Sequence, residues 1–308
     1  MIHLLTLNPA IDLEFDIRKP VQGKIGSIQK FELTAGGKAL NVARFLKALK
    51  VPARAWFGAG AGDDSTHVLY RSLLKKEGLH VHFLPNVQPI RFNLVLHEKN
   101  ESAKHNHPGF QFAGGKALLQ TLKSQLKKGD LLVLTGRLPK GNEGLYAGLI
   151  RYFNPRQVKT VVDTSGFGLK KALEQRPWFW KVNLHEFAEA WGGQWPHLKK
   201  VQTLVPLFRK KGLSHGAITH GIQGAVLWDL RQAFWVRSEI HFKSRLVIGA
   251  GDGFLAGYLA AFQAGLDLKT RSRWASAAAA TVADYGIQGF KAASFKQNLT
   301  KVQIGELA

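Results

Sequence analysis

The chain of 308 residues carries 43 lysines and arginines against 21 aspartates and glutamates, a formal charge of +22, and contains no cysteine. The lack of cysteine excludes disulfides and thiolate metal sites and suits a reducing compartment, so we expect a cytoplasmic protein. No uncharged run approaches the roughly 20 apolar residues that span a bilayer, and we expect no membrane partner.

The positive charge favours anionic partners, and nucleic acid is the first to consider. The basic residues recur as dispersed pairs, such as Lys75-Lys76, Lys127-Lys128 and Lys210-Lys211, and do not form one block. Dispersed pairs are typical of solvated surfaces, and no groove-binding or base-stacking element accompanies them. We therefore do not expect nucleic acid as a partner.

Short apolar runs alternate with helix-length segments along the chain. We predict buried strands at residues 4–7, 53–57, 131–134, 160–162 and 217–219. At 75–79, 127–134 and 210–219 a lysine pair is followed by a glycine and then by an apolar run. This order predicts the last turn of a helix, its C-cap and the start of a strand. This alternation predicts an α/β fold with a doubly wound, mainly parallel sheet.

Two segments depart from this pattern. Residues 13–33 and 91–107 alternate apolar and polar side chains, which is typical of half-buried antiparallel strands. We expect them to form a small β-sheet lid, inserted into a single domain that spans residues 1–308.

Polar and glycine residues follow several predicted strands. These segments are 8–12, 135–139, 163–166 and 183–186. Because ligands of an open parallel sheet bind outside the carboxyl ends of its strands, we expect the segments to form one polar cleft. For any single Asp or Thr among them, helix capping is an open alternative.

The most specific local feature is Gly249-Ala250-Gly251-Asp252-Gly253, which precedes an apolar run of helical length. Glycines at a helix start let backbone N–H groups converge on a phosphate-like anion. Asp252 beside such an anion hole is able to accept the proton of an attacking hydroxyl. The alternative is that Asp252 only caps the helix.

Other phosphate and metal motifs do not occur in the sequence. Gly37-Lys38 is followed by Ala39, where a P-loop has Ser or Thr, and neither G-x-G-x-x-G nor H-E-x-x-H is present. His105-Asn106-His107 has the composition of a metal site, but we interpret it as a polar loop.

Four stretches resemble the pfkB, or ribokinase-like, family of carbohydrate kinases, most closely its branch of 1-phosphofructokinases, tagatose-6-phosphate kinases and minor-type 6-phosphofructokinases. The stretches are TLNPAID at 6–12, AGGKALNVAR at 35–44, TGRLPKGNEGLYAGLI at 135–150 and GAGDGFLAGYLA at 249–260. The resemblance implies a ribokinase-like fold, ATP as co-substrate, Mg²⁺ as cofactor and a phosphosugar as acceptor. Relatives form homodimers through the lid. The resemblance extends to such a contact between two copies of this chain, but the sequence itself does not show it.

The resemblance also implies roles for individual residues. The implied catalytic residues are the general base Asp252 and the anion-hole residues Gly249, Ala250 and Gly251. The implied contacts of the sugar are Asp12, Gly36, Gly37, Asn41 and Asn93, with Lys38 and Arg91 near its phosphate. The implied nucleotide-binding residues are Asn183, Glu186, Thr219, Gly221 and Gly224, of which Glu186 organises Mg²⁺ indirectly.

The sequence departs from the family pattern at several positions. Arg137 replaces a common Ser, and we count it among the substrate-binding residues, although its guanidinium would either bind the substrate phosphate or block the usual contact. Gly26-Ser27 replaces an Asn-Arg pair typical of the branch, Leu246-Val247-Ile248 lacks the frequent Asp or Asn and Thr, and Gly253 replaces a usual Ser. These departures leave the identity of the sugar open.

The expected function is that of an ATP-dependent phosphosugar kinase, with 1-phosphofructokinase as first choice. Tagatose-6-phosphate kinase and 6-phosphofructokinase are alternatives. A catalytically weak family member with a binding or regulatory role is the rival from another class.

Overall fold

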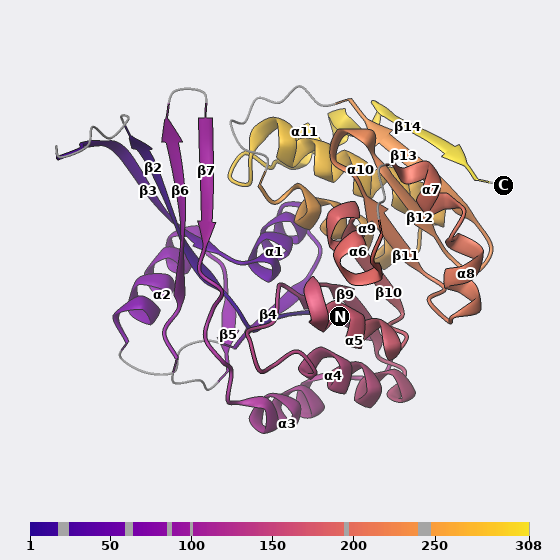
Figure 1. The fold of residues 1–308 in the computed structure, drawn as a ribbon, viewed down its shortest axis with the longest axis horizontal. Coiled ribbons are helices and arrows are strands. Elements are labelled where there is room, and N and C mark those ends of the chain that lie inside the picture. The colour runs from indigo at the N-terminus through magenta and orange to yellow at the C-terminus, as the bar shows by residue number, and fades with distance from the viewer. Residues whose placement is uncertain are drawn as a thin grey trace.

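A ten-stranded sheet forms the centre of the protein in the computed structural model, which describes residues 1–17, 25–58, 64–84, 88–98, 101–193, 197–239 and 248–307 (Figure 1). Its strand order is β14-β13-β12-β11-β10-β9-β8-β1-β4-β5. The strands are β1 (Ile2–Thr6), β4 (Ala53–Phe57), β5 (Val81–Phe83), β8 (Leu131–Thr135), β9 (Lys159–Asp163), β10 (Phe179–Asn183), β11 (Gly216–Thr219), β12 (Ala225–Trp228), β13 (Ala233–Ser238) and β14 (Val302–Glu306). Neighbours from β5 to β11 pair in parallel, and β11 to β14 pair antiparallel.

Helices cover both faces of this sheet, because successive side chains of a buried strand point to opposite faces. Leu4 and Val133 belong to one cluster of buried side chains, and Leu5 and Leu132 to the other. The helices of the first cluster are α1 (Lys38–Ala48), α2 (Ser65–Glu77), α9 (Ala250–Gln263), α10 (Leu268–Tyr285) and α11 (Ala292–Leu299). Those of the second are α3 (Gly115–Gln125), α4 (Leu145–Phe153), α5 (Gly166–Glu174), α6 (Leu184–Trp191), α7 (Leu198–Gln202) and α8 (Val205–Lys210). The predicted doubly wound α/β fold is confirmed.

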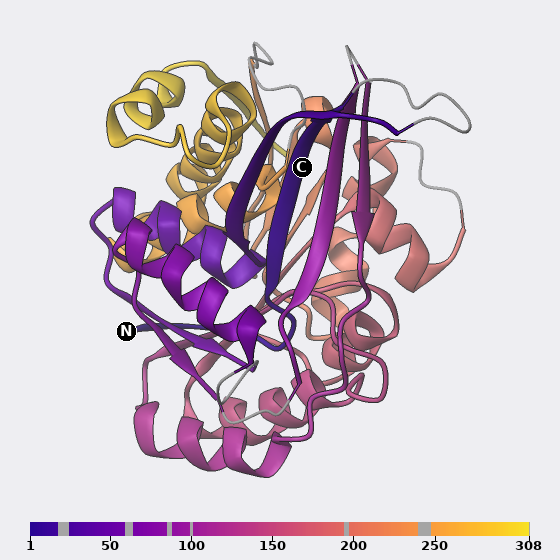
Figure 2. The same cartoon turned by 90° about the vertical axis from the view of Figure 1, so that its left-hand side faces the viewer.

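A second, four-stranded sheet projects beyond the helices as the predicted lid (Figure 2). Its strands are β2 (Ala10–Ile17), β3 (Ile28–Gly36), β6 (Arg91–Glu98) and β7 (Glu101–Asn106), in the order β3-β2-β6-β7. The central pair β2–β6 is parallel, which differs from the predicted antiparallel arrangement. Parts of both predicted lid segments, residues 18–24 and 99–100, lie outside the described residues.

The lid begins earlier than its alternation indicated. β2 begins at Ala10, so Asp12 lies on a lid strand and not in a loop after β1. His105 and Asn106 lie on β7, where we predicted a loop. The single-domain organisation stays a prediction.

The lysine pairs mark helix ends in two of three cases. Gly78 is the left-handed C-cap of α2 with a φ of 60°, and Gly212 follows α8 with a φ of 78°. The prediction for 127–134 is wrong in detail, because α3 ends at Gln125. Asp130 there accepts a hydrogen bond from the backbone N–H of Lys127 and so forms a separate turn.

Two further features bear on the class of protein. A G-x-S-x-G pattern at residues 212–216 runs from the end of a helix into β11, which is the reverse of the strand–turn–helix order that a hydrolase nucleophile needs. Among the described helices, none combines the length and apolar composition that crossing a bilayer requires.

Candidate active site

A cavity of about 840 Å³ lies where the carboxyl ends of the parallel strands face the lid. Sixteen of the residues that the sequence predicted for the site line this cavity: Asp12, Gly37, Lys38, Asn41, Arg91, Asn93, Arg137, Asn183, Glu186, Thr219, Gly221, Gly224, Gly249, Ala250, Gly251 and Asp252. Gly36 is the remaining predicted residue, and it lies behind Asp12. The sequence motifs, dispersed over most of the chain, are therefore brought together in one place.

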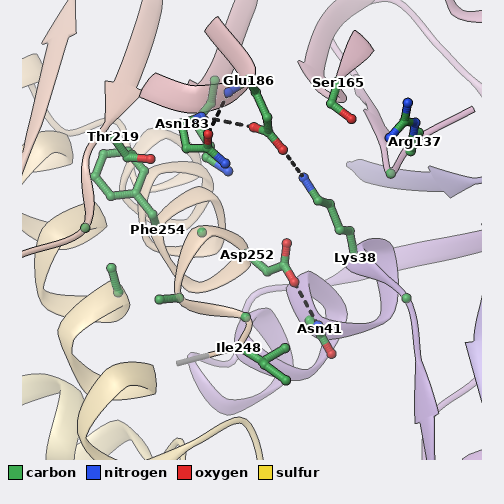
Figure 3. Close-up of a pocket in the computed structure, with 18 of the residues that line it drawn as sticks. Lys38, Asn41, Arg137, Ser165, Asn183, Glu186, Thr219, Ile248, Asp252 and Phe254 are labelled. Atoms are coloured by element: carbon green, nitrogen blue, oxygen red, sulfur yellow. Dashed lines mark hydrogen bonds and ion pairs between the residues drawn. The ribbon is translucent and has the colours of Figure 1, made fainter. Parts of the chain in front are cut away.

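Asp252 lies in the first turn of α9 and is buried, with 5% of its surface exposed. Its Oδ2 accepts a hydrogen bond of 2.7 Å from Nδ2 of Asn41 on α1 (Figure 3). The N-cap of α9 is Gly249, so Asp252 does not occupy the capping position. Burial raises the pKa of Asp252 to about 6, against the opposite effect of the nearby Lys38 ammonium. A carboxylate with this pKa is suited to proton transfer near neutral pH.

The glycine turn before Asp252 has the geometry of an anion site. Gly249 adopts a φ of 80°, a left-handed conformation that glycine tolerates best, and α9 begins at the next residue. The first N–H groups of a helix have no partner inside it and favour a bound anion. A Cβ at Gly251 would lie only 3.0 Å from Nζ of Lys181, so an ammonium group lies against the turn.

Lys181 was not predicted as a site residue, and its partner Asp163 was predicted only as part of the polar segment 163–166. Asp163 is fully buried and accepts hydrogen bonds from Nζ of Lys38 at 2.8 Å and from Nζ of Lys181 at 2.9 Å. Burial raises the pKa of Asp163, but the charges of the two lysines outweigh it and hold the pKa below its ordinary value. A lysine inside the apolar strand Phe179–Asn183 was the available signal for this pair.

Lys38 connects this buried pair to the rim of the cavity. Its Nζ lies 3.6 Å from Oε1 of Glu186, and Figure 3 shows the two side chains pointing toward each other above Asp252. Because two carboxylates already surround Lys38, its charge is balanced within the protein.

Asp12 and Asn93 form the polar wall on the lid side. They are directly opposite each other on β2 and β6, and Nδ2 of Asn93 donates to Oδ1 of Asp12. Gly36 is needed behind this pair, because a Cβ there would lie 2.2 Å from Oδ2 of Asp12. Arg91 donates from Nη1 to Asn93 Oδ1 and from Nε to the carbonyl oxygen of Asn8.

The opposite end of the cavity is bounded by α6 and by the loop after β11. Asn183 and Glu186 form a capping box, in which each side chain accepts the backbone N–H of the other residue, at 2.8 and 3.0 Å. Thr219 ends β11, and Gly224 has a φ of 95° with no room for a Cβ, which would lie 2.0 Å from the carbonyl oxygen of Val236. Phe254 and small residues of α10 complete this apolar end, namely Ser276, Ala279, Ala280 and Ala283.

The departures from the family pattern lie in different parts of the structure. Arg137 is exposed and lines the cavity, with its side chain next to Ser165 in Figure 3. Gly26-Ser27 is exposed on the lid and does not line the cavity. Ile248 lies in the cavity wall, whereas Leu246 and Val247 are outside the described residues.

Comparison with known proteins gives one consistent result. The family described as pfkB family carbohydrate kinase matches residues 5–289. The 1-phosphofructokinase of Bacillus subtilis is 28% identical over 280 residues, which cover 89% of each chain.

Solved structures resemble this fold over nearly its whole length. The phosphofructokinase-2 of Escherichia coli in complex with potassium has a TM-score of 0.88 at 22% identity, covering 97% of this chain and 98% of that one. The tetrameric inhibited form of the same enzyme has a TM-score of 0.86 with the same identity and coverage.

Proposed function

The chain belongs to the pfkB family of carbohydrate kinases, and on that premise we propose that it transfers the γ-phosphoryl group of ATP to a hydroxyl of a sugar that already carries one phosphate. Fructose 1-phosphate is the first choice, because the relative from Bacillus subtilis is named 1-phosphofructokinase. The observation that carries the proposal is the buried carboxylate of Asp252 beside the glycine turn of α9, facing the polar lid residues across one cavity.

Asp252 acts as the general base in this proposal. The sugar hydroxyl loses its proton to the Asp252 carboxylate while its oxygen forms a bond to the γ-phosphorus. The bond between that phosphorus and the bridging oxygen breaks, and ADP leaves with the electron pair. The hydrogen bond from Asn41 fixes the orientation of the carboxylate.

The turn at Gly249 to Gly251 stabilises the charge on the phosphoryl group during transfer. The Lys181 ammonium lies against this turn, and preorganised donors of this kind are worth several kcal/mol in a site that excludes water. Asp163 keeps Lys181 in place by accepting its hydrogen bond.

Mg²⁺ would enter with the phosphates of ATP, whose charge it neutralises. Within the described part of the chain, no group of three acidic or histidine side chains forms a metal site of its own. Glu186 fits an indirect role, because Oε2 is held by the capping box while Oε1 faces the cavity, where it would bind the water shell that Mg²⁺ retains. Thr219, Gly221 and Gly224 would border the nucleotide.

Asp12, Gly37, Asn41 and Asn93 would contact the sugar hydroxyls, with Gly36 holding Asp12 in position. Carboxylate and amide groups in a partly buried wall suit this task, since each forms directional hydrogen bonds. The phosphate of the sugar would lie among the cations at this end of the cavity.

A substrate panel tests the proposal. ADP release would be measured with MgATP and fructose 1-phosphate, tagatose 6-phosphate, fructose 6-phosphate, fructose or ribose. A phosphosugar should exceed fructose and ribose in kcat/KM by at least about 100-fold, because a free sugar leaves the phosphate pocket unfilled. Efficient use of free fructose or ribose would contradict the phosphosugar assignment, and silence across the panel would favour the weak-enzyme rival.

We also propose that two copies associate through the lid, in the cytoplasm. On the face away from the cavity, Leu13 and Leu33 pack against the main core, but Phe31 is 64% exposed and Phe92 is 40% exposed. Exposed aromatic side chains on a sheet face are typical of a protein interface. A related enzyme, the phosphofructokinase-2 of Escherichia coli, has been solved as a tetramer.

A further inference from the structure

The cations in the wall of the cavity differ in how they are compensated. Among the described residues, these cations are Lys38, Arg91, Lys104, Arg137 and Lys181. Lys38 and Lys181 share the carboxylate of Asp163. Arg91 donates to the carbonyl oxygens of Asn8 and His107, and its Nη2 has no acceptor in the described chain.

Of these five cations, Lys104 and Arg137 are the two whose side chains have no acceptor among the described residues. Neither side chain has a hydrogen bond or an ion pair with another described residue, and both are exposed to the cavity. A solvated lysine on a free surface needs no partner. Two cations that line one cavity without a hydrogen-bond acceptor, however, favour an anion in that cavity.

Strand register places Lys104 on the inner face of the lid. In the β6–β7 ladder Lys104 is opposite Val95, and Asn106, two residues further, is opposite Asn93. Side chains two residues apart on a strand share a face, so Lys104 points to the side of Asn93 and Asp12. It therefore reaches into the cavity one row further out than the proposed sugar contacts.

Arg137 approaches the same region from the main sheet. It follows β8, and its Nη2 lies 3.6 Å from the position that a Cβ on Gly166 would take. Nδ2 of Asn8 donates to the carbonyl oxygens of both Pro108 and Arg137, at 2.9 and 3.4 Å. Asn8 thus joins the turn of Arg137 to the segment that continues from β7 and Lys104.

We propose that Lys104 from the lid and Arg137 from the main sheet bind the phosphate that the sugar already carries, together with the unused Nη2 of Arg91. This assignment rests on the proposed function and gives the site its selectivity for a phosphorylated sugar. Lys38, for which the resemblance implies a place near that phosphate, forms ion pairs with Asp163 and Glu186. Because the two cations come from different sheets, the bound phosphate also joins the lid to the core.

The test replaces each cation by a neutral side chain, in Lys104→Met and Arg137→Met, and uses the phosphosugar that the wild-type enzyme turns over best. Each change should raise the KM for that phosphosugar by roughly 10-fold or more and leave the KM for MgATP within about twofold, because a charge-assisted hydrogen bond is lost at the sugar end alone. Lys30→Met is the matched control, since Lys30 is exposed on the same lid and is outside the cavity wall.

A second measurement separates this role from general damage to the site. The double variant should reduce the ratio of kcat/KM for the phosphosugar to kcat/KM for the corresponding free sugar by at least about 10-fold. A normal KM for the phosphosugar in Lys104→Met, or an equal rise in the KM for MgATP, would overturn the assignment. If the wild-type enzyme uses no phosphosugar, the proposed function and this assignment both fail.

Discussion

Asn41 on α1 and Asp252 on α9 are joined by a hydrogen bond of 2.7 Å, although the two residues are 211 positions apart in the sequence. The bond reaches the buried carboxylate in the first turn of α9. Because Asn41 donates to the ionised form of Asp252, it opposes the effect of burial on the pKa of that carboxyl group.

This pair determines the expected pH dependence of turnover. Asp252 must be deprotonated to act as a base, so kcat should fall about tenfold per pH unit as the pH decreases below about 6. Asn41→Leu removes the donor and should move this acidic limb to higher pH. The measurement is kcat at saturating substrates, which reports the enzyme–substrate complex, and an unchanged limb in the variant would assign it to another group.

Replacement of the base itself should affect chemistry and not nucleotide binding. Asp252→Asn is expected to reduce kcat by about 10² to 10⁴ while the affinity for MgATP, measured by calorimetry, remains close to the wild-type value. Asp267→Asn is the matched control, because Asp267 caps α10 outside the cavity and asparagine caps equally well. Turnover near the wild-type rate in Asp252→Asn would refute the mechanism.

The buried carboxylate of Asp163 should be important for stability. Asp163→Ala leaves the buried Lys181 and its neighbour Lys38 without their shared acceptor, so the free energy of unfolding should decrease by about 3 to 5 kcal/mol. Urea denaturation gives this value. Asp64→Ala, which removes the exposed N-cap of α2, should cost only about 1 kcal/mol, and equal losses in the two variants would argue against the pairing described.

The lid interface predicts a mass in solution of about twice the 34.1 kDa of one chain. Phe31→Lys should produce monomers, because it places a charge on the exposed apolar face of β3. Phe167→Lys changes an equally exposed aromatic residue on α5 and should leave the mass unchanged. Light scattering after size-exclusion chromatography distinguishes these outcomes, and a monomeric wild-type chain would remove the proposal.

Features that depend on local sequence could be predicted well. The strand Ala53–Phe57 has the predicted bounds, because a short apolar run next to helix-ending residues specifies it locally. The alternation at residues 28–33 likewise indicated a strand of the lid. The glycine turn at Gly249 was recognisable because a left-handed residue before a helix favours glycine.

Features that depend on pairing across the sheet could not be predicted. Asp163 and Lys181 meet because β9 and β10 are neighbours in the sheet, and no spacing in the sequence expresses this. Lys104 lies in the cavity because it is opposite Val95 in the β6–β7 ladder. Hydrophobic alternation alone indicates only the face of the sheet on which such a side chain lies. Arg137 was recognised as unusual, but that its side chain has no acceptor in the described part of the chain is visible only in three dimensions.

The close approach of Gly36 and Asp12 has a consequence for how this sequence can diverge. Gly36 has no positive φ, so alanine would suit its backbone, and the first effect of a methyl group there would be to expel the Asp12 carboxylate. Such a variant should keep its fold, while the Asp12 carboxylate would be displaced from the wall that faces the sugar. Positions 12 and 36 are therefore epistatic. A chain that has lost the aspartate accepts alanine at position 36 without further loss of activity, whereas a chain that retains the aspartate does not. A screen for expression alone would not reveal the difference.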